Sequence, residues 1–384
     1  MIQKQELPFG RPYIDEKEKD AANEVLGGHI LTHGPKCLAF ETLFEKHIAG
    51  GKAVTTSSCM ASLHISAICL GFRKGDEILV PAQTHVATVH AIELVGAKPV
   101  FIDCELETGN IDLELIEEHI TKKTRGIVIV HFAGIPVKMD RVIEIADNFR
   151  LKVIEDCALA LGSKYQGKHV GLWGDTGCFS FYPVKHITTG EGGMLTSKNE
   201  ETAQKIARFR AFNVDRNHSE RTTPGVYDVI GVGLNYRMSE IQAAIGVVQM
   251  QKLEEILSLR KKNFLALKNG LKKISSLAML DSQNIDAENS YYAGILLLKE
   301  GLRNKRDELV NYLKARRIGF SIYYPNPVPR MSYYQEKYAT NEKIYKNASI
   351  VSDCSIALPV GPHLNDIDMN FIVEEVSNFA TKNQ

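Results

Sequence analysis

Lys185 is the residue of this sequence whose surroundings best suit covalent chemistry. It follows the β-branched and aromatic run 177–184 and precedes a turn that contains Gly190, Gly192 and Gly193. A lysine held at such a strand end, with little solvent around it, has a lowered pKa, and its neutral amine can form a Schiff base with a carbonyl compound. The alternative is an ordinary surface lysine in a loop, which the segment alone does not exclude.

Two further segments could hold a heterocyclic group that carries a phosphate. Asp156 ends the apolar run 153–156 and could keep a heterocyclic nitrogen protonated, or it could simply cap the next helix. The segment TTSSCMASLH, residues 55–64, places small hydroxyl residues before a helical pattern, whose first N–H groups can bind a phosphate. A plain serine N-cap is the alternative there. Ser180, on the strand before Lys185, could offer a hydroxyl to the same phosphate.

An alternation of strands and helices must position these residues. Strand-like apolar runs occur at 77–80, 98–103, 126–132 and 152–156, and helical patterns occur near 59–70, 85–95, 112–121 and 139–149. This order predicts an α/β fold with a mostly parallel central sheet sandwiched by helices, and a ligand beyond the carboxyl ends of the strands. From residue 241, apolar residues at helical spacing predict a long helix, continuous or interrupted, that leads into a second domain. We expect a large domain with an N-terminal arm at 1–250 and a smaller α+β domain at 251–384.

The phosphate cradle, carboxylate, serine and lysine occur in the order that a pyridoxal phosphate (PLP) site requires. At these residues the sequence resembles the sugar-nucleotide aminotransferases of the DegT/StrS type, which have the aspartate-aminotransferase fold (fold type I). The resemblance covers nearly the whole chain, from residues 31–35 to Leu358 and Pro359. Its most specific stretches are FSFYPVKHITTGEGGM, VIEDCALALG, GDEILVPAQTHVAT and GLNYRM. It implies a PLP-dependent transferase with a large cofactor-binding domain and a small C-terminal domain.

The resemblance also implies roles for individual residues. Lys185 would be the catalytic residue that forms the Schiff base with PLP, and Asp156 would pair with its pyridine nitrogen. The other cofactor-binding residues would be Ser58, Cys59, Met60 and Ser180 at the phosphate, His85 on the ring face, and Asn235 across a subunit interface. The resemblance therefore implies a homodimer whose active sites are shared between the two subunits.

Three positions depart from the family pattern. Leu159 stands where glutamine is common, and Met60 replaces a common threonine, so only its backbone N–H could serve the phosphate. Pro329 stands where a substrate-side histidine is common, which leaves the substrate open. In the surrounding proline-rich loop, Tyr324 and Arg330 are predicted to bind substrate, with Arg330 pairing with a phosphate. A surface arginine on a structural turn is the alternative for Arg330.

Composition excludes several other classes of protein. Lys and Arg together number 46, as do Asp and Glu, so the formal net charge is zero and a nucleic-acid binder or a polybasic membrane binder is not expected. The sequence contains no apolar run of the length of a signal peptide or transmembrane helix. Its seven cysteines form no CxxC pair and its histidines no convincing ligand group, so we expect no metal site. A cytoplasmic protein with reduced thiols is the expectation.

The resemblance implies a PLP-dependent aminotransferase. Glutamate would donate the amino group, and the keto group of a nucleotide-linked (deoxy) sugar would accept it, as in polysaccharide biosynthesis. One alternative keeps the chemistry but uses a small phosphorylated ketone. Another is a non-catalytic regulator that binds PLP, which the presence of Lys185 disfavours because such a protein has no need of a base there.

Overall fold

A seven-stranded sheet forms the centre of the molecule. The computed structural model describes residues 6–215, 223, 225–341 and 344–383. The strands follow the order β1-β9-β8-β5-β4-β2-β3, and the neighbours from β8 to β3 pair in parallel, whereas β9 is antiparallel to both β1 and β8. Their bounds are Lys52–Thr56 (β1), Glu77–Pro81 (β2), Lys98–Ile102 (β3), Thr124–Val130 (β4), Lys152–Asp156 (β5), Thr176–Ser180 (β8) and Gly193–Ser197 (β9). The predicted α/β fold with a mostly parallel sheet is confirmed.

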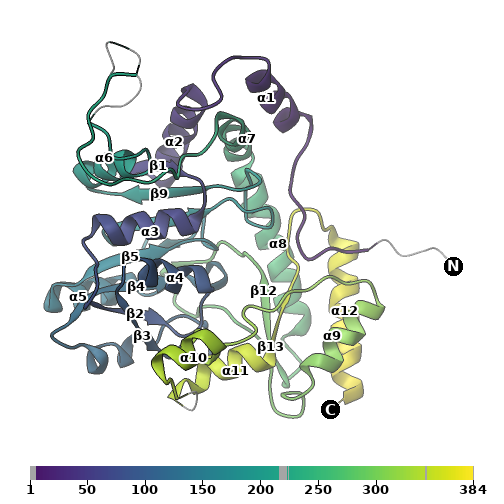
Figure 1. Cartoon of the computed structure of the whole chain (residues 1–384). Helices are drawn as coiled ribbons and strands as arrows, with labels where there is room; N and C mark the ends of the chain where they lie inside the picture. The colour runs from purple at the N-terminus through teal and green to yellow at the C-terminus, as the bar shows by residue number, and fades with distance from the viewer. Residues whose placement is uncertain (1–5, 216–222, 224, 342–343, 384) are drawn as a thin grey trace.

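Helices cover both faces of this sheet (Figure 1). Successive residues of a strand point to opposite faces, so Ile78 and Val80 join the core under α3 and α4, whereas Leu79 joins the core under α5. This is why the strands read as near-continuous apolar runs. The helices packed around the sheet are α2 (Pro35–Ile48), α3 (Cys59–Cys69), α4 (Val86–Leu94), α5 (Met139–Phe149), α6 (Glu200–Phe209) and α7 (Glu240–Gln251).

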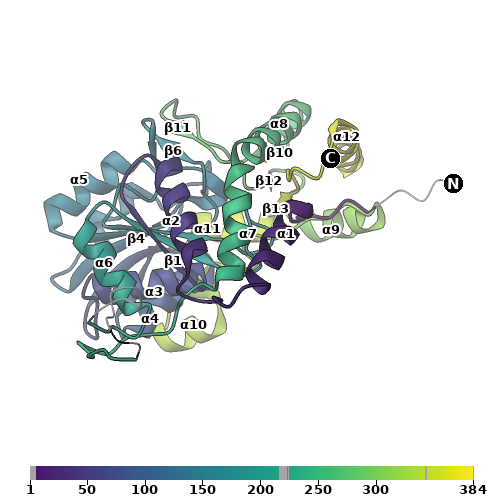
Figure 2. The same cartoon turned by 90° about the horizontal axis from the view of Figure 1, so that it is seen from above.

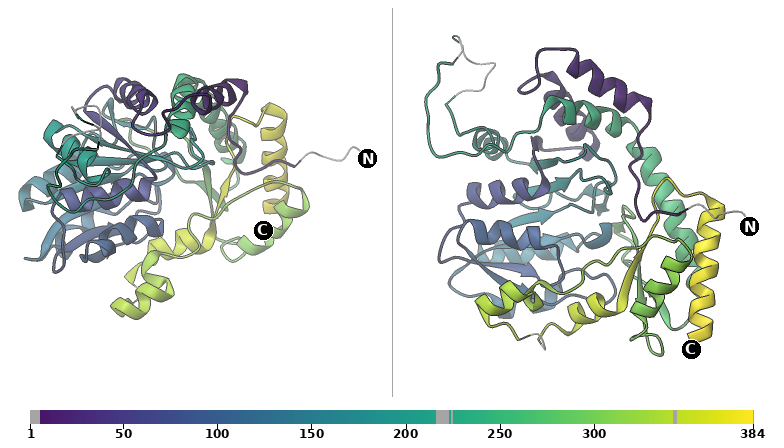
Figure 3. Two further views of the ribbon diagram at one scale, coloured as in Figure 1. Left: turned by 45° about the horizontal axis from the view of Figure 1, so that its top comes forward. Right: turned by 45° about the vertical axis from the view of Figure 1, so that its right-hand side comes forward.

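The C-terminal part has its own antiparallel sheet, in the order β10-β12-β13. Figures 2 and 3 show its helices α8, α9 and α12 to one side of the seven-stranded sheet. Its elements are β10 (Leu277–Met279), β12 (Gly294–Leu298), β13 (Ser355–Leu358), α8 (Leu253–Leu271), α9 (Arg306–Ala315), α10 (Ser332–Tyr338), α11 (Lys346–Cys354) and α12 (Asp366–Asn383). A third, small sheet joins β11 (Ala287–Glu288), β6 (Lys164–Tyr165) and β7 (Lys168–His169).

The predicted long helix is interrupted, because α7 ends at Gln251 and α8 begins at Leu253. Between them, Lys252 places its Nζ 2.9 Å from Asp15 and 2.6 Å from Glu18, which fixes α1 (Glu16–Leu26) against the break. The boundary predicted after residue 250 lies beside this break and stays a prediction. The first described residues lie against the C-terminal part, where Leu7 forms a bridge with Ile318.

The helix expected near 112–121 is wrong. The chain forms two short 3₁₀ turns there, Leu113–Leu115 and Glu117–His119. The buried side chains of Leu113 and Ile116 are three residues apart, a spacing that a 3₁₀ turn also places on one face. Within the described ranges, no helix combines the length and the apolar character needed to cross a membrane.

Candidate active site

A cavity of about 380 Å³ opens at the carboxyl ends of β5 and β8. Eight of the ten residues predicted for the site line it: Ser58, Cys59, Met60, His85, Asp156, Ser180, Lys185 and Tyr324. Asn235 and Arg330 are not among the lining residues. A second, larger cavity of about 540 Å³ lies beside β10 and β12 and is lined by none of the ten. The first cavity is therefore the candidate site, since eight of the predicted residues line it.

Lys185 reaches this cavity from the turn after β8. Its backbone N–H donates to the carbonyl of Tyr182 (2.9 Å), and its Nζ lies 5.0 Å from the centre of the Tyr292 ring. Burial lowers the pKa of the Lys185 amine to about 8, although Cys59 and Asp156 act in the opposite direction. About a tenth of the amine is therefore neutral at pH 7, far more than for an ordinary lysine, and bond formation with a carbonyl group requires this neutral form.

Capture of PLP by the cofactor-free chain is expected to depend on pH through this amine. Below the pKa of about 8, the rate should rise about tenfold per pH unit as the neutral fraction grows, and above it the rate should level off. Stopped-flow absorbance of the lysine-bound cofactor measures this rate. A rate that continues to rise beyond pH 9.5 would show an ordinary exposed lysine and contradict the desolvated setting of Lys185.

Asp156 ends β5 as a buried carboxylate, with only 4% of its surface exposed. Its Oδ2 accepts a hydrogen bond from the hydroxyl of Thr88 (2.7 Å), and its Oδ1 accepts one from the N–H of Ala158 (3.0 Å). Both contacts fix the carboxylate toward the cavity while leaving lone pairs for a further donor. Sequence reasoning missed Thr88, whose only signal was its place in the first turn of a predicted helix.

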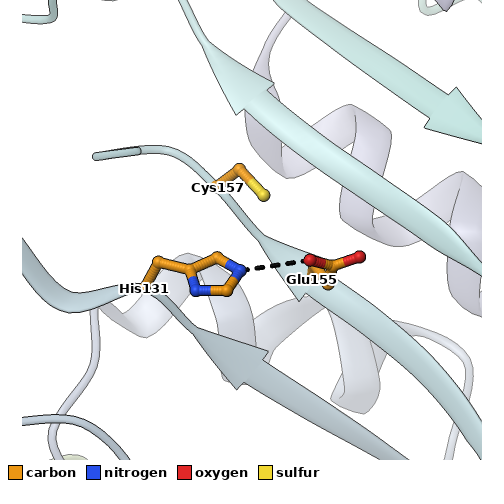
Figure 4. A group of neighbouring side chains, drawn as sticks. All are labelled: His131, Glu155 and Cys157. Carbon is orange, nitrogen blue, oxygen red and sulfur yellow. Dashed lines mark hydrogen bonds and ion pairs between the residues drawn. The ribbon is translucent and has the colours of Figure 1, made fainter. Parts of the chain in front are cut away.

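The neighbouring Glu155 lies beside His131 and Cys157 (Figure 4). It lies within 4.8 Å of the ligand atoms of His131 and Cys157, a group that could in principle hold a metal ion. However, its two oxygens accept the N–H groups of Gly171 (2.7 Å), Trp173 (2.8 Å) and Gly174 (2.7 Å). His131 accepts from the Val137 N–H at Nδ1, so its Nε2 carries the proton that reaches Glu155 (3.2 Å). Because the Glu155 oxygens and the His131 nitrogens are already paired, Glu155 and His131 form a buried hydrogen-bond network that anchors the loop after β7.

The start of α3 forms an anion cradle at the other end of the cavity. Ser58 is the N-cap, and its Oγ accepts the N–H of Ala61 (3.1 Å). The N–H groups of Cys59 and Met60 have no acceptor within the helix, so they can donate to a bound anion. Gly193 on β9 lies so close that a Cβ there would be 2.5 Å from the Ser58 carbonyl carbon and 2.7 Å from the Cys59 nitrogen. Ser180, opposite Gly193 in the sheet, completes this end of the cavity.

Aromatic side chains line the rest of the cavity. His85 is the N-cap of α4, and its ring lies 5.6 Å from that of Tyr324. Partial desolvation lowers the pKa of His85, which favours the neutral ring that could lie against a flat ligand. Tyr292 and Tyr323, which the sequence did not reveal, join through their hydroxyl groups (2.8 Å). Leu159 also lines the cavity and offers an apolar surface only.

Arg330 and Asn235 lie elsewhere. The guanidinium of Arg330 forms a two-pronged ion pair with Asp353, with Nη1 2.8 Å from Oδ2, and its Nε donates to Asn326 (2.6 Å). In the described chain the Arg330 side chain thus binds a carboxylate outside the cavity, and its predicted contact with a substrate phosphate stays a prediction. Asn235 is exposed and pairs through its backbone with Ala211. Nothing within this single chain tests its predicted role across a subunit interface.

The residues that line the cavity fit PLP. The volume is that of a small-molecule pocket, and the cradle formed by Cys59, Met60 and Gly193 suits a phosphate. Asp156 offers a buried carboxylate for a ring nitrogen, and Lys185 offers an amine with a lowered pKa for an aldehyde. These groups lie on different elements around one space, so a single compact cofactor could contact all of them.

Comparison with known proteins agrees with this geometry. Residues 12–377 match the DegT/DnrJ/EryC1/StrS aminotransferase family. The chain is 35% identical to GDP-perosamine synthase of Escherichia coli O157:H7, over 97% of this chain and 98% of that protein. It is 32% identical to the UDP-4-amino-4-deoxy-L-arabinose–oxoglutarate aminotransferase of Shewanella sediminis, with the same coverage of both chains.

A solved structure shows the same fold. Spr1654 of Streptococcus pneumoniae, a proposed sugar aminotransferase, superposes with a TM-score of 0.93 at 27% identity, over 98% of this chain and 100% of that one. Its structures include a form with pyridoxamine phosphate and a form with PLP. This chain accordingly belongs to the DegT/DnrJ/EryC1/StrS aminotransferase family, and it is a PLP-dependent aminotransferase of the same fold.

Proposed function

We propose that this aminotransferase moves an amino group from glutamate to the keto group of a nucleotide-linked sugar. The observation that carries the proposal is the convergence of Lys185, Asp156 and the start of α3 on one cavity. The relatives named above support the substrates, because one makes a GDP-linked amino sugar and another pairs a UDP-linked amino sugar with oxoglutarate. Oxoglutarate is the keto acid that glutamate becomes when it gives up its amino group.

The chain's own residues would share the work as follows. PLP, when bound, supplies an electron sink for the carbanion that forms at the substrate carbon. Asp156, fixed by Thr88 and Ala158, would hold the proton on the pyridine nitrogen. The amine of Lys185 would move the proton to and from the substrate carbon, since its pKa of about 8 suits both directions near neutral pH. The aromatic rings of His85 and Tyr324 would exclude water from this space.

A transfer experiment tests this proposal. The enzyme with PLP is given glutamate that carries an isotopic label on nitrogen, together with a panel of keto sugar nucleotides, and the products are weighed by mass spectrometry. Label in an aminated nucleotide sugar is the expected result. Label only in a small phosphorylated ketone would favour the alternative acceptor. Label in no acceptor at all would contradict the proposal and favour a protein that binds PLP without transferring an amino group.

We extend the proposal to a homodimer with shared active sites. A run of apolar side chains lies just before Asn235 and is more than half exposed: Val226, Tyr227, Val229, Ile230 and Val232. Several exposed apolar side chains in one short segment are typical of an interaction surface. If a second copy covers this patch, its neighbour Asn235 would come close to the partner's cavity and could reach the phosphate there.

Mixing two inactive variants is expected to restore activity. Lys185→Ala lacks the amine, and Asn235→Ala lacks the amide that is proposed to act in the other subunit. Each mixed dimer would have one intact site, so an equal mixture after subunit exchange should recover about a quarter of wild-type activity. Size-exclusion chromatography with differently tagged subunits verifies the exchange. If exchange is complete and Asn235→Ala is severely defective, no recovery would mean that each site is built within one chain.

A further inference from the structure

Arg260 is a buried arginine directly behind the candidate site. It lies on α8 with 5% of its surface exposed. Its Nη1 donates to the carbonyl oxygen of Tyr292 (2.9 Å), and its Nη2 donates to the carbonyl oxygen of Lys185 (3.4 Å). Within the described part of the chain, its Nε has no hydrogen-bond partner and no carboxylate forms an ion pair with it. Burial lowers the pKa of this guanidinium to about 10.

A buried guanidinium without a carboxylate is expensive in free energy. Among the described residues, the guanidinium donates hydrogen bonds only to two backbone carbonyls, and an apolar side chain would avoid the cost of burying the charge. Those two carbonyls, however, come from different parts of the fold. Lys185 lies in the turn after β8, and Tyr292 lies just before β12 of the C-terminal sheet. The forked guanidinium is a side chain that can hold both at once.

The two residues that Arg260 holds also meet at their side chains. The Nζ of Lys185 lies 5.0 Å from the centre of the Tyr292 ring, and the Tyr292 hydroxyl is bonded to that of Tyr323 (2.8 Å). Movement of either backbone would therefore change the distance between the amine and the Tyr292 ring beside it. Both side chains line the cavity, whereas Arg260 does not.

We propose that Arg260 is a positioning residue that fixes Lys185 against Tyr292 and thereby keeps the amine desolvated. The inference rests on the role proposed for Lys185. Cys59 on α3 and Asp156 on β5 raise the pKa of the amine, and neither contacts Arg260 in the described structure. The neighbouring ionisable groups also include His85, His186 and Tyr292. Arg260 therefore acts on Lys185 through the backbone carbonyl of Lys185, and not through Cys59 or Asp156.

Two variants of Arg260 separate the effect of its forked geometry from the effect of its charge. Arg260→Lys keeps a positive charge, but an ammonium on a flexible stem lacks the fork that spans both carbonyls. Arg260→Met removes the charge and keeps much of the volume. Asn263→Leu is the matched control, because Asn263 lies one turn later on α8, is 2% exposed and donates to the carbonyl of Gly361 (3.0 Å), away from the cavity. Loss of this Asn263 hydrogen bond should lower the stability of the fold without moving Lys185.

The first readout is the reactivity of Lys185 in the full chain freed of cofactor. A small reagent such as acetic anhydride is applied at a series of pH values, and labelling of the peptide that contains Lys185 is followed by mass spectrometry. The wild-type midpoint is expected near pH 8. In both Arg260 variants it should rise by about one unit, because water then reaches the amine. In Asn263→Leu it should stay at the wild-type value.

The second readout is the kinetics of the enzyme loaded with PLP. A misplaced amine slows proton transfer, so kcat should fall at least about tenfold in Arg260→Lys while the KM for the amino donor changes little. An unchanged midpoint in Arg260→Lys would overturn the inference, and if Arg260→Met does not fold, Arg260→Lys alone decides. Because the labelling needs neither cofactor nor substrate, failure of the proposed amino transfer would leave it interpretable.

Discussion

Lys185→Ala is expected to abolish amino transfer while the chain keeps its fold. The amine would be absent both as the group that bonds PLP and as the base that moves the proton, so turnover should fall at least about a thousandfold. The folded chain binds a proton at Lys185 less tightly than the unfolded chain, because the pKa is about 8 instead of 10.5. This costs stability as pH falls below 10.5, and the full cost is present below about 8, so loss of the amine should not destabilise the cofactor-free chain at pH 7.

Activity and thermal unfolding of the same preparation check this prediction. Lys252→Ala is the control, because Lys252 is well buried but binds Asp15 and Glu18 away from the cavity. That variant should lose stability and keep its turnover. Wild-type rates in Lys185→Ala, with the substitution verified by mass spectrometry, would remove Lys185 from the mechanism.

Asp156→Asn is expected to have the second largest effect. An amide can still accept from Ala158 and contact Thr88, so the fold should be kept. It cannot, however, hold a proton on the ring nitrogen by its charge, so the carbanion at the substrate carbon loses stabilisation. Removing one such electrostatic contact typically costs about 10²- to 10³-fold in kcat. Steady-state kinetics at saturating cofactor measure the loss.

Glu155→Gln supplies the matched comparison one residue away. Glu155 is fully buried and bonded to three backbone N–H groups and His131, so the substitution should lower the free energy of unfolding by about 1.5–3 kcal/mol. Its effect on kcat should be small, since it does not line the cavity. Equal losses of activity in the two variants would mean that Asp156 acts only through the fold.

The sequence predicted the parts of the site that depend on local pattern. Asp156 ends strand β5, and Lys185 follows the neighbouring parallel strand β8. The carboxyl ends of parallel strands meet at one edge of the sheet, so the two residues were expected close together. The start of α3 could be predicted because Ser58 is a recognisable cap. Thr88, on the other hand, contacts Asp156 across 68 positions, which no local pattern reveals.

The remaining misses have the same cause. The sequence likewise did not indicate that Arg330 pairs with Asp353, which lies 23 positions away on another element. No local pattern in the sequence singles out Arg260, and only the packing of α8 against Lys185 and Tyr292 shows that it is buried. Tertiary contacts of this kind depend on the assembled fold, so pattern and propensity alone do not determine them.

Identification of the lysine that binds the cofactor tests the account most directly. The enzyme loaded with PLP is treated with borohydride, which makes a Schiff base permanent, and is then digested and sequenced by mass spectrometry. The mass of the reduced cofactor is expected on the peptide that contains Lys185, and on no other lysine peptide. The same mass on a different lysine, or a loaded enzyme in which no lysine is modified, would contradict the assignment of this cavity as the active site.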